Sequence, residues 1–164
     1  MASNKKEDTG TNRSRTPNSK EFLDYISSGW QESSNKAISQ SPAADFAKAR
    51  RDKVAVAFPN QIVVIEAGAP KTRSNDTEYR YRPHAAFAHL TGWGSETVPD
   101  SVLVIDTKES TQILFLRPTA GKDSDEFFAN PAIGEFWVGA RPTLDDVSSL
   151  LGIETRDLKD LSAY

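Results

Sequence analysis

The chain has 164 residues, of which 37% are hydrophobic and 26% are charged, values typical of one globular domain with a sizeable core. Its net charge of -3 at pH 7 argues against a protein that binds nucleic acid. Because the sequence has no cysteine, a disulfide framework, a thiolate metal site and a cysteine nucleophile are excluded.

The N-terminal part of the chain divides into a tail and a helical extension. Residues 1–19 are polar with mixed charges, so we expect a disordered tail, and they lack the apolar core of a signal peptide. No apolar run reaches the roughly 20 residues that cross a bilayer, which favours a cytoplasmic protein without a membrane partner. Residues 20–40 are expected to form the extension, because apolar side chains recur there at helical steps. These side chains are Phe22, Leu23, Tyr25, Ile26 and Trp30, and Ser19 is the expected N-cap.

The segment 41–58 predicts a second helix. Ser41 is the expected N-cap, Pro42 suits the first helical position, and Pro59-Asn60 follows the helix. Three basic residues in this helix are interspersed with acidic ones, so we expect them on a solvated face. They are Arg50, Arg51 and Lys53.

Three apolar runs predict strands. Ile62–Ile65 is an unbroken β-branched run, typical of a strand covered on both faces. Val102–Ile105 and Gln112–Leu116 are separated by a segment of hairpin-loop length, so we expect antiparallel neighbours. A short helix is predicted from about residue 83 to residue 91, where Gly92 ends it.

The C-terminal part is predicted to contain a loop region followed by short elements. Residues 117–134 are loop-like, with a candidate short helix at 124–129. Thr143 is the expected cap of a helix that Gly152 ends, and a short strand is expected to follow at residue 153. Another helix begins near Asp157 and has run only two turns at Tyr164, which indicates a cut rather than a natural end.

The sequence lacks the common catalytic and phosphate-binding motifs, including a Walker loop, Gly-x-Ser-x-Gly and His-Glu-x-x-His. His84 and His89 are five residues apart, whereas a helical metal pair needs a spacing of four, so we expect structural histidines at or near the surface. The acidic run at 123–126 does not match a calcium loop. We therefore predict no catalytic residue and no metal ligand in this chain.

Two positions remain as candidates for binding. Asp76 lies in a polar loop with Arg73, Tyr79 and Arg82, where its carboxylate would either cap the local turn or receive the ammonium group of a ligand. Trp137 lies in an aromatic patch that ends in glycine and proline, and would either belong to the core or form a wall of a binding site. The residues themselves leave both alternatives open.

Three segments in order resemble the N-terminal domain of aminopeptidase P, in the creatinase/prolidase group of pita-bread metallopeptidases. They are Thr72–Arg82, Phe87–Gly92 (Phe-Ala-His-Leu-Thr-Gly) and Phe136–Arg141 (Phe-Trp-Val-Gly-Ala-Arg), and the likeness covers roughly residues 43–164. The resemblance implies an α/β fold with a mixed β-sheet flanked by helices. With the tail (1–19) and the helical extension (20–40) inferred above, it leaves residues 41–164 as an aminopeptidase P-like N-terminal domain.

In the family that these segments resemble, the N-terminal domain breaks no bond. A separate C-terminal domain holds two metal ions, usually manganese (Mn(II)), through two aspartates, a histidine and two glutamates, and removes the first residue of a peptide when proline follows it. The chain contains no such set of ligands. The resemblance therefore implies a non-catalytic domain of a Xaa-Pro aminopeptidase, a metallo-exopeptidase whose catalytic domain lies outside this chain.

The resemblance also assigns candidate roles and partners. Asp76 would approach the amino end of the substrate and Trp137 would line the pocket, both across a subunit interface, while Arg73, Tyr79 and Arg82 would hold the shape of the loop. The implied partners are the protein's own C-terminal domain, further copies of the chain in a homo-oligomer, and a peptide with proline in second position. One departure is the segment 85–89, where the family often has Ser-Asp-Phe followed by two aromatic residues.

Two other functions remain as alternatives. Some pita-bread relatives have lost their metals and bind peptides or histones, and the chain would then belong to a binding module. A prolidase or creatinase shares the fold and acts on a dipeptide or on creatine.

Overall fold

The computed structural model describes residues 19–30, 38–75 and 77–163, which form two compact units. The sheet unit comprises residues 38–118 and 142–163, and the aromatic unit comprises residues 19–30 and 119–141. The predicted disordered tail lies outside the described residues except for Ser19, and the predicted division into domains stays a prediction. None of the helices formed by the described residues has the length and apolar character that a bilayer crossing requires.

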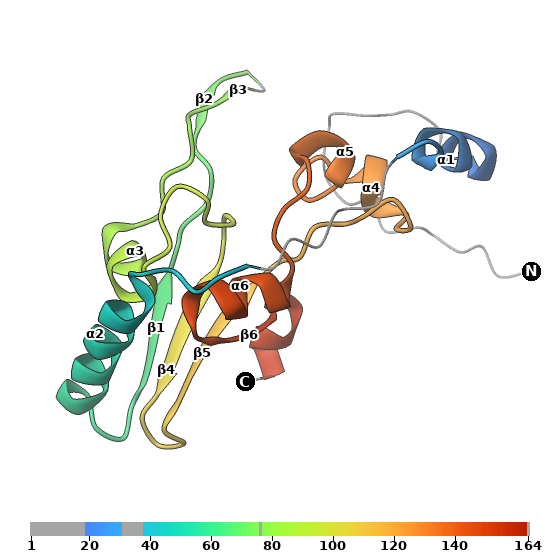
Figure 1. Ribbon diagram of the computed structural model, residues 1–164. Coiled ribbons are helices and arrows are strands. Elements are labelled where there is room, and N and C mark those ends of the chain that lie inside the picture. The colour runs from blue at the N-terminus through green and yellow to red at the C-terminus, as the bar shows by residue number, and fades with distance from the viewer. Residues whose placement is uncertain (1–18, 31–37, 76, 164) are drawn as a thin grey trace, which may run out of the picture. The chain divides into compact units, whose positions relative to one another are not determined.

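The sheet unit is built on a mixed four-stranded sheet, as predicted. Its strand order is β1 (Ile62–Glu66), β4 (Val102–Asp106), β5 (Thr111–Leu116) and β6 (Glu154–Asp157) (Figure 1). β4 is antiparallel to both β1 and β5, with Val104 opposite Val64 and Ile113. β6 pairs parallel to β5, so the short strand predicted after Gly152 joins the sheet at its second edge.

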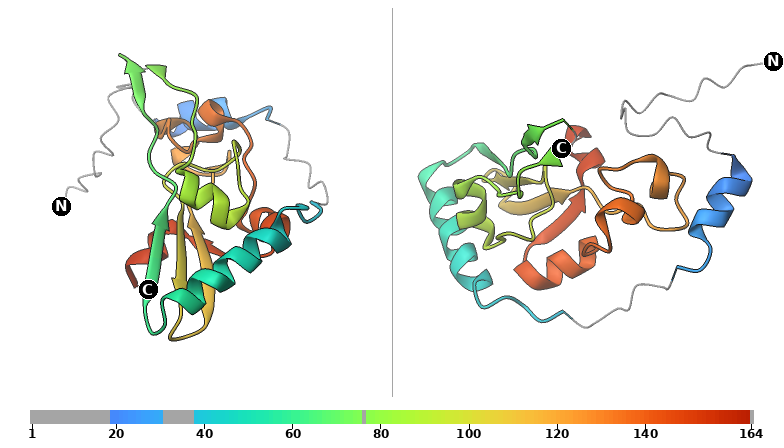
Figure 2. Two further views of the ribbon diagram at one scale, coloured as in Figure 1. Left: turned by 90° about the vertical axis from the view of Figure 1, so that its left-hand side faces the viewer. Right: turned by 90° about the horizontal axis from the view of Figure 1, so that it is seen from above.

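Helices cover both faces of this sheet to different extents. α2 (Ala44–Ala57), α3 (Ala85–Thr91) and α6 (Leu144–Leu151) pack on the face that carries the main hydrophobic core (Figures 1 and 2). The other face is covered by the 3₁₀-helix η1 (Leu158–Ala163), which packs with the β4 and β5 side chains. The helix expected near Asp157 is therefore this 3₁₀-helix, which begins directly after β6.

The prediction that both faces of β1 are covered was wrong. Val63 and Ile65 pack against the main core, but Ile62 and Val64 are 45% and 55% exposed. β1 is the edge strand of the sheet farthest from β6, and η1 lies over the β5 end of the sheet. Continuous β-branched sequence therefore does not distinguish this edge strand from a fully enclosed one.

The helix ends agree only in part with their predicted caps. α3 and α6 end at Gly92 and Gly152, both with left-handed backbone, and Thr143 forms a capping box with Asp146. α2 begins at Ala44 instead of at Pro42, and its N-cap is Ala43. The Ser41 hydroxyl accepts a hydrogen bond from the Ala43 N–H, and the Ser41 backbone N–H donates to the carbonyl of Leu150. Ser41 is therefore held in a turn that precedes the helix.

The solvated face predicted for the basic residues of α2 was also wrong in one position. Arg51 is only 1% exposed, although Lys53 is exposed and Arg50 is half-buried. The Arg51 guanidinium donates from Nε to Oε1 of Gln112 at 2.7 Å and from Nη1 to the Leu90 carbonyl at 2.9 Å. The buried guanidinium is paired with acceptors on β5 and at the end of α3, so Arg51 connects α2 to both elements.

The aromatic unit contains three short helices, α1 (Lys20–Ser27), α4 (Glu126–Ala129) and α5 (Glu135–Val138). Ser19 caps α1, as predicted, because its hydroxyl accepts a hydrogen bond from the Phe22 N–H at 3.2 Å. α4 falls within the predicted candidate helix, and α5 is a helical turn within the aromatic patch, for which no helix was predicted. A Cβ on Gly134, between α4 and α5, would clash with the carbonyl oxygens of residues 126, 127 and 130, so this turn requires glycine.

Candidate functional site

The polar loop predicted at 72–82 is an exposed hairpin, which we call the arm and define as residues 71–80. β2 (Thr72–Ser74) and β3 (Thr77–Glu78) pair in antiparallel fashion with an irregularity in register, and the Tyr79 N–H donates to the Lys71 carbonyl at 2.9 Å. Asn75 adopts a left-handed backbone with φ of 48° at the turn. Every described side chain of the arm is exposed, and Asp76 itself lies outside the described residues.

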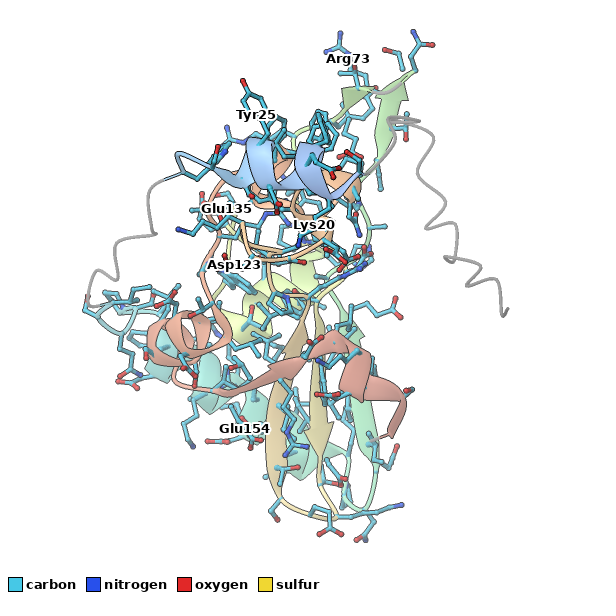
Figure 3. The ribbon with its side chains drawn as sticks, turned by 90° about the vertical axis from the view of Figure 1, so that its right-hand side faces the viewer. Lys20, Tyr25, Arg73, Asp123, Glu135 and Glu154 are labelled. Carbon is cyan, nitrogen blue, oxygen red and sulfur yellow. The ribbon has the colours of Figure 1, made fainter. Side chains whose placement is uncertain are left out.

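The three residues predicted to shape the loop are all exposed. Arg73 lies near the outer end of the arm (Figure 3), Tyr79 is 60% exposed, and Arg82 follows the arm. Their predicted role depends on Asp76, so it stays a prediction.

The base of the arm is fixed by a different set of residues. The Tyr81 hydroxyl lies 2.8 Å from the Gly68 carbonyl oxygen and 3.2 Å from that of Ala67. The His84 N–H donates to the Ala67 carbonyl at 2.9 Å, and the Asp100 N–H donates to the Gly68 carbonyl at 3.1 Å. The two chain segments on either side of the arm are therefore tied to each other, and the first of them is also tied to the loop before β4.

Gly68 is required at this base by its backbone and by its surroundings. Its φ is +87°, and a Cβ would lie 2.6 Å from Nε2 of the His84 imidazole. His84 Nδ1 is in turn 3.2 Å from the Glu66 carbonyl oxygen. The imidazole therefore fills the space that a side chain at position 68 would need.

The charges at the base favour a protonated Tyr81. Burial raises the pKa of the Tyr81 phenol, and the nearby Asp100 carboxylate raises it further. Burial and the carboxylate of Glu66 also raise the pKa of Asp100. Tyr81 consequently remains a hydrogen-bond donor to the two carbonyl groups at the base across the physiological pH range.

Trp137 lies in α5 and is only partly packed. Its indole Nε1 donates to the Phe128 carbonyl at 2.8 Å, and its ring lies 5.2 Å from Phe128 and 5.1 Å from Phe136, measured between centroids. The side chain is 46% exposed. A ring that is held by two aromatic neighbours and a hydrogen bond, yet open on one side, is suited to contact a ligand.

Trp137 belongs to the aromatic unit, whereas the arm that carries Asp76 belongs to the sheet unit. Their predicted meeting at one substrate site therefore stays a prediction.

Arg141 is the last residue of the Trp-x-Gly-x-Arg segment. Burial lowers the pKa of its guanidinium.

The histidines are exposed, as predicted, with His84 at the base of the arm and His89 in α3. In the part of the chain that the structure describes, no group of three or more histidine, aspartate or glutamate side chains is arranged to hold a metal ion. The resemblance assigns the two manganese ions to a separate C-terminal domain, and the described residues offer no site for them.

The mixed sheet, its flanking helices and the exposed arm define an α/β domain with a two-stranded hairpin outside its main sheet. Residues 47–164 match the family described as Aminopeptidase P, N-terminal domain. The chain belongs to this family.

Two relatives are Xaa-Pro aminopeptidases of Streptomyces coelicolor. Xaa-Pro aminopeptidase 1 is 34% identical over 146 residues, which cover 88% of this chain and 29% of the relative. Xaa-Pro aminopeptidase 2 is 28% identical over 148 residues, which cover 88% of this chain and 31% of the relative. The chain thus spans about a third of the length of these relatives.

The likeness extends beyond the family match toward the N-terminus. A coverage of 88% corresponds to about 144 of the 164 residues, and any unbroken span of that length contains residues 21–144. Most of α1 and all of α5 therefore fall inside the region shared with Xaa-Pro aminopeptidase 1.

Solved structures of Escherichia coli aminopeptidase P have the same fold. The low-pH form matches with a TM-score of 0.57 and 25% identity over 78% of this chain and 26% of that protein. The form with the inhibitor Pro-Leu matches with a TM-score of 0.59 and 25% identity over 76% of this chain and 26% of that protein.

Proposed function

We propose that this chain is the non-catalytic N-terminal domain of a metal-dependent Xaa-Pro aminopeptidase, which removes the residue before a proline from the N-terminus of a peptide. The observation that carries the proposal is the family match over residues 47–164. The 34% identity to a Xaa-Pro aminopeptidase supports the substrate class. The proposed partners are a C-terminal catalytic domain and further copies of the chain.

The metal chemistry is assigned to a region outside this chain. Two manganese ions would activate the water that attacks the peptide bond there. The described residues form no group that would hold such ions. The task left to this domain is to bind and orient the substrate.

In this proposal the arm and Trp137 line the substrate site across a subunit interface. Asp76 would receive the ammonium group of the peptide, since a charge-assisted hydrogen bond is stronger where water is excluded. The exposure of the arm supports this role, because the arm reaches away from the sheet unit's own core. Trp137 would pack against the side of the peptide.

The first test measures release of the N-terminal residue from an Xaa-Pro peptide in the presence of Mn²⁺. The 164-residue chain is compared with the full product of its gene. Activity of the full product alone is the expected result. Activity of the 164-residue chain would refute the proposal, because it would demand a metal site within this chain. Activity in neither form would favour the peptide- or histone-binding module, or a prolidase or creatinase with another substrate.

A second test addresses Asp76 in the active full product. Asp76→Ala is expected to lower kcat/KM by roughly 10- to 100-fold, the value of one charge-assisted hydrogen bond. Glu78→Ala is the matched control, because Glu78 is an exposed carboxylate on the same arm. Equal kinetics of the two variants would return Asp76 to the role of a turn-capping residue.

A further inference from the structure

Six aromatic side chains gather in the aromatic unit from segments about a hundred residues apart in sequence. Phe22 and Trp30 come from the N-terminal segment 19–30, and the others come from α4 and α5. The four on α4 and α5 are Phe127, Phe128, Phe136 and Trp137. The N-terminal segment therefore packs against the region that carries the proposed substrate-contacting ring.

Two series of ring contacts connect the N-terminal segment to Trp137. Phe22 packs edge-on against Phe128 at 5.3 Å, and Phe128 both packs against Trp137 and accepts its Nε1–H hydrogen bond. Trp30 lies 5.8 Å from Phe136, which in turn packs edge-on against Trp137 at 5.1 Å. The N-terminal segment is thus connected to Trp137 through both of its aromatic neighbours, Phe128 and Phe136.

The helix that carries Trp137 and the helix before it have little stability of their own. α4 and α5 have four residues each, too few to persist as isolated helices in water. Backbone hydrogen bonds between Ala120 and residues 133 and 135 close this segment, but they do not fix the aromatic rings. α1 also buries no residue completely. The packing between these elements therefore has to hold them in place.

We propose that residues 19–30 form a brace that fixes the orientation of Trp137, with Phe22 and Trp30 as positioning residues. The functional part of this inference rests on the proposed contact between Trp137 and the substrate. The region shared with Xaa-Pro aminopeptidase 1 includes both residues 22–30 and Trp137, whereas the family match begins at residue 47. The proposed brace thus lies outside the family match but inside the region shared with this relative.

The test uses Trp137 as the only tryptophan of the 164-residue chain. Trp30→Phe keeps an aromatic ring in the brace. Trp93→Phe removes a buried indole whose Nε1 has no hydrogen-bond partner among the described residues. In this background, Phe22→Ala is compared with Tyr25→Ala. The Tyr25 side chain lies on the same helix and is 77% exposed (Figure 3).

Acrylamide quenching and fluorescence anisotropy of Trp137 report whether the ring is held. Because Trp137 is 46% exposed when packed, its release raises the exposed area, and with it the quenching constant, about twofold. Phe22→Ala is expected to produce this rise and a fall in anisotropy, while Tyr25→Ala leaves both unchanged. Equal values for the two variants would overturn the brace. Measurement well below the thermal transition, with Phe22→Leu as a milder variant, separates loosening of the ring from unfolding.

Kinetics of the active full product then separate the brace from the role of Trp137. Phe22→Ala is expected to raise KM for an Xaa-Pro peptide about three- to tenfold with little change in kcat, and to have no further effect in a Trp137→Ala background. A rise in quenching without a change in KM would support the brace and refute the substrate contact of Trp137. A rise in KM without a change in quenching would refute the brace.

Discussion

Replacement of Arg51 by methionine is expected to destabilise the sheet unit far more than its position on a charged helix suggests. Arg51 is 1% exposed and donates hydrogen bonds to the Leu90 carbonyl and to Gln112. Burial lowers the pKa of its guanidinium, and the carboxylate of Asp52 opposes this shift in part. Methionine fills a similar volume but cannot donate.

The size of the effect follows from the two acceptors that methionine leaves without a donor. The Leu90 carbonyl lies in the last turn of α3, where carbonyl groups have no partner within the helix. The buried Leu90 carbonyl costs about 1–3 kcal/mol when it is unpaired, the half-buried Gln112 amide oxygen costs less, and relief of the buried charge offsets part of this. We expect a net loss of about 1–3 kcal/mol, which corresponds to a fall of roughly 5–10 °C in Tm.

Urea denaturation and thermal melting, followed by circular dichroism, measure the loss. Arg50→Met is the matched control, because Arg50 is the neighbouring residue and donates from Nη1 to the His89 carbonyl at an exposed site. Its cost should be about 0.5 kcal/mol or less. If Arg51→Met costs no more than this control, the inference that Arg51 supports the α2–α3–β5 junction is wrong.

Three further predictions concern other parts of the chain. Burial and the carboxylate of Glu66 raise the pKa of Asp100, so the folded state disfavours the charged form and stability is lost as the pH rises through that pKa. Asp100→Asn should therefore raise Tm at about pH 7 and have no effect at about pH 3. Gly134→Ala should destabilise the aromatic unit by about 1–3 kcal/mol and weaken its near-ultraviolet circular dichroism, whereas Gly121→Ala, where a Cβ meets only a side-chain atom at 3.7 Å, should not. Thr143→Ala removes the capping box of α6 and should cost about 1 kcal/mol in urea denaturation.

The strands of the sheet could be predicted because their sequences are unambiguous. Val102–Asp106 and Thr111–Leu116 are apolar runs separated by a short turn, so both their existence and their antiparallel pairing follow from local sequence. β6 is different, because Glu154–Asp157 is polar and its strand is parallel to β5. Its place in the sheet depends on the return of the chain through α6, which no local pattern records.

The errors at Arg51 and β1 have a common physical origin. Charge patterning describes which residues share a helix, but the burial of Arg51 is decided by α3 and β5, which pack over it. Ile62 and Val64 have the composition of an enclosed strand, but the element on the second face, η1, packs with other strands. Burial is a property of what another segment covers, and that information is not local.

The sequence predicted the polar loop in which the arm forms, but not the residues that fix the base of the arm. The segment Tyr79-Arg-Tyr-Arg82 offers two tyrosines two positions apart, which in a regular strand would lie on the same side. Tyr79 points to solvent and Tyr81 to the carbonyl groups at the base of the arm. β3 ends at Glu78, so these residues follow no regular strand. Only the carbonyl groups that Tyr81 reaches in the fold distinguish it from Tyr79.

Both candidate binding elements are exposed at one end and held by distant segments at the other. The base of the arm is tied to Asp100 and His84, and the Trp137 ring is packed through Phe128 against the N-terminal helix. Rigid support lowers the entropy that a binding group loses when it meets its ligand. A substrate contact built on an exposed hairpin or on a single helical turn would be weak without such support. In the proposed function, the segments that support each element would contribute to binding without touching the ligand.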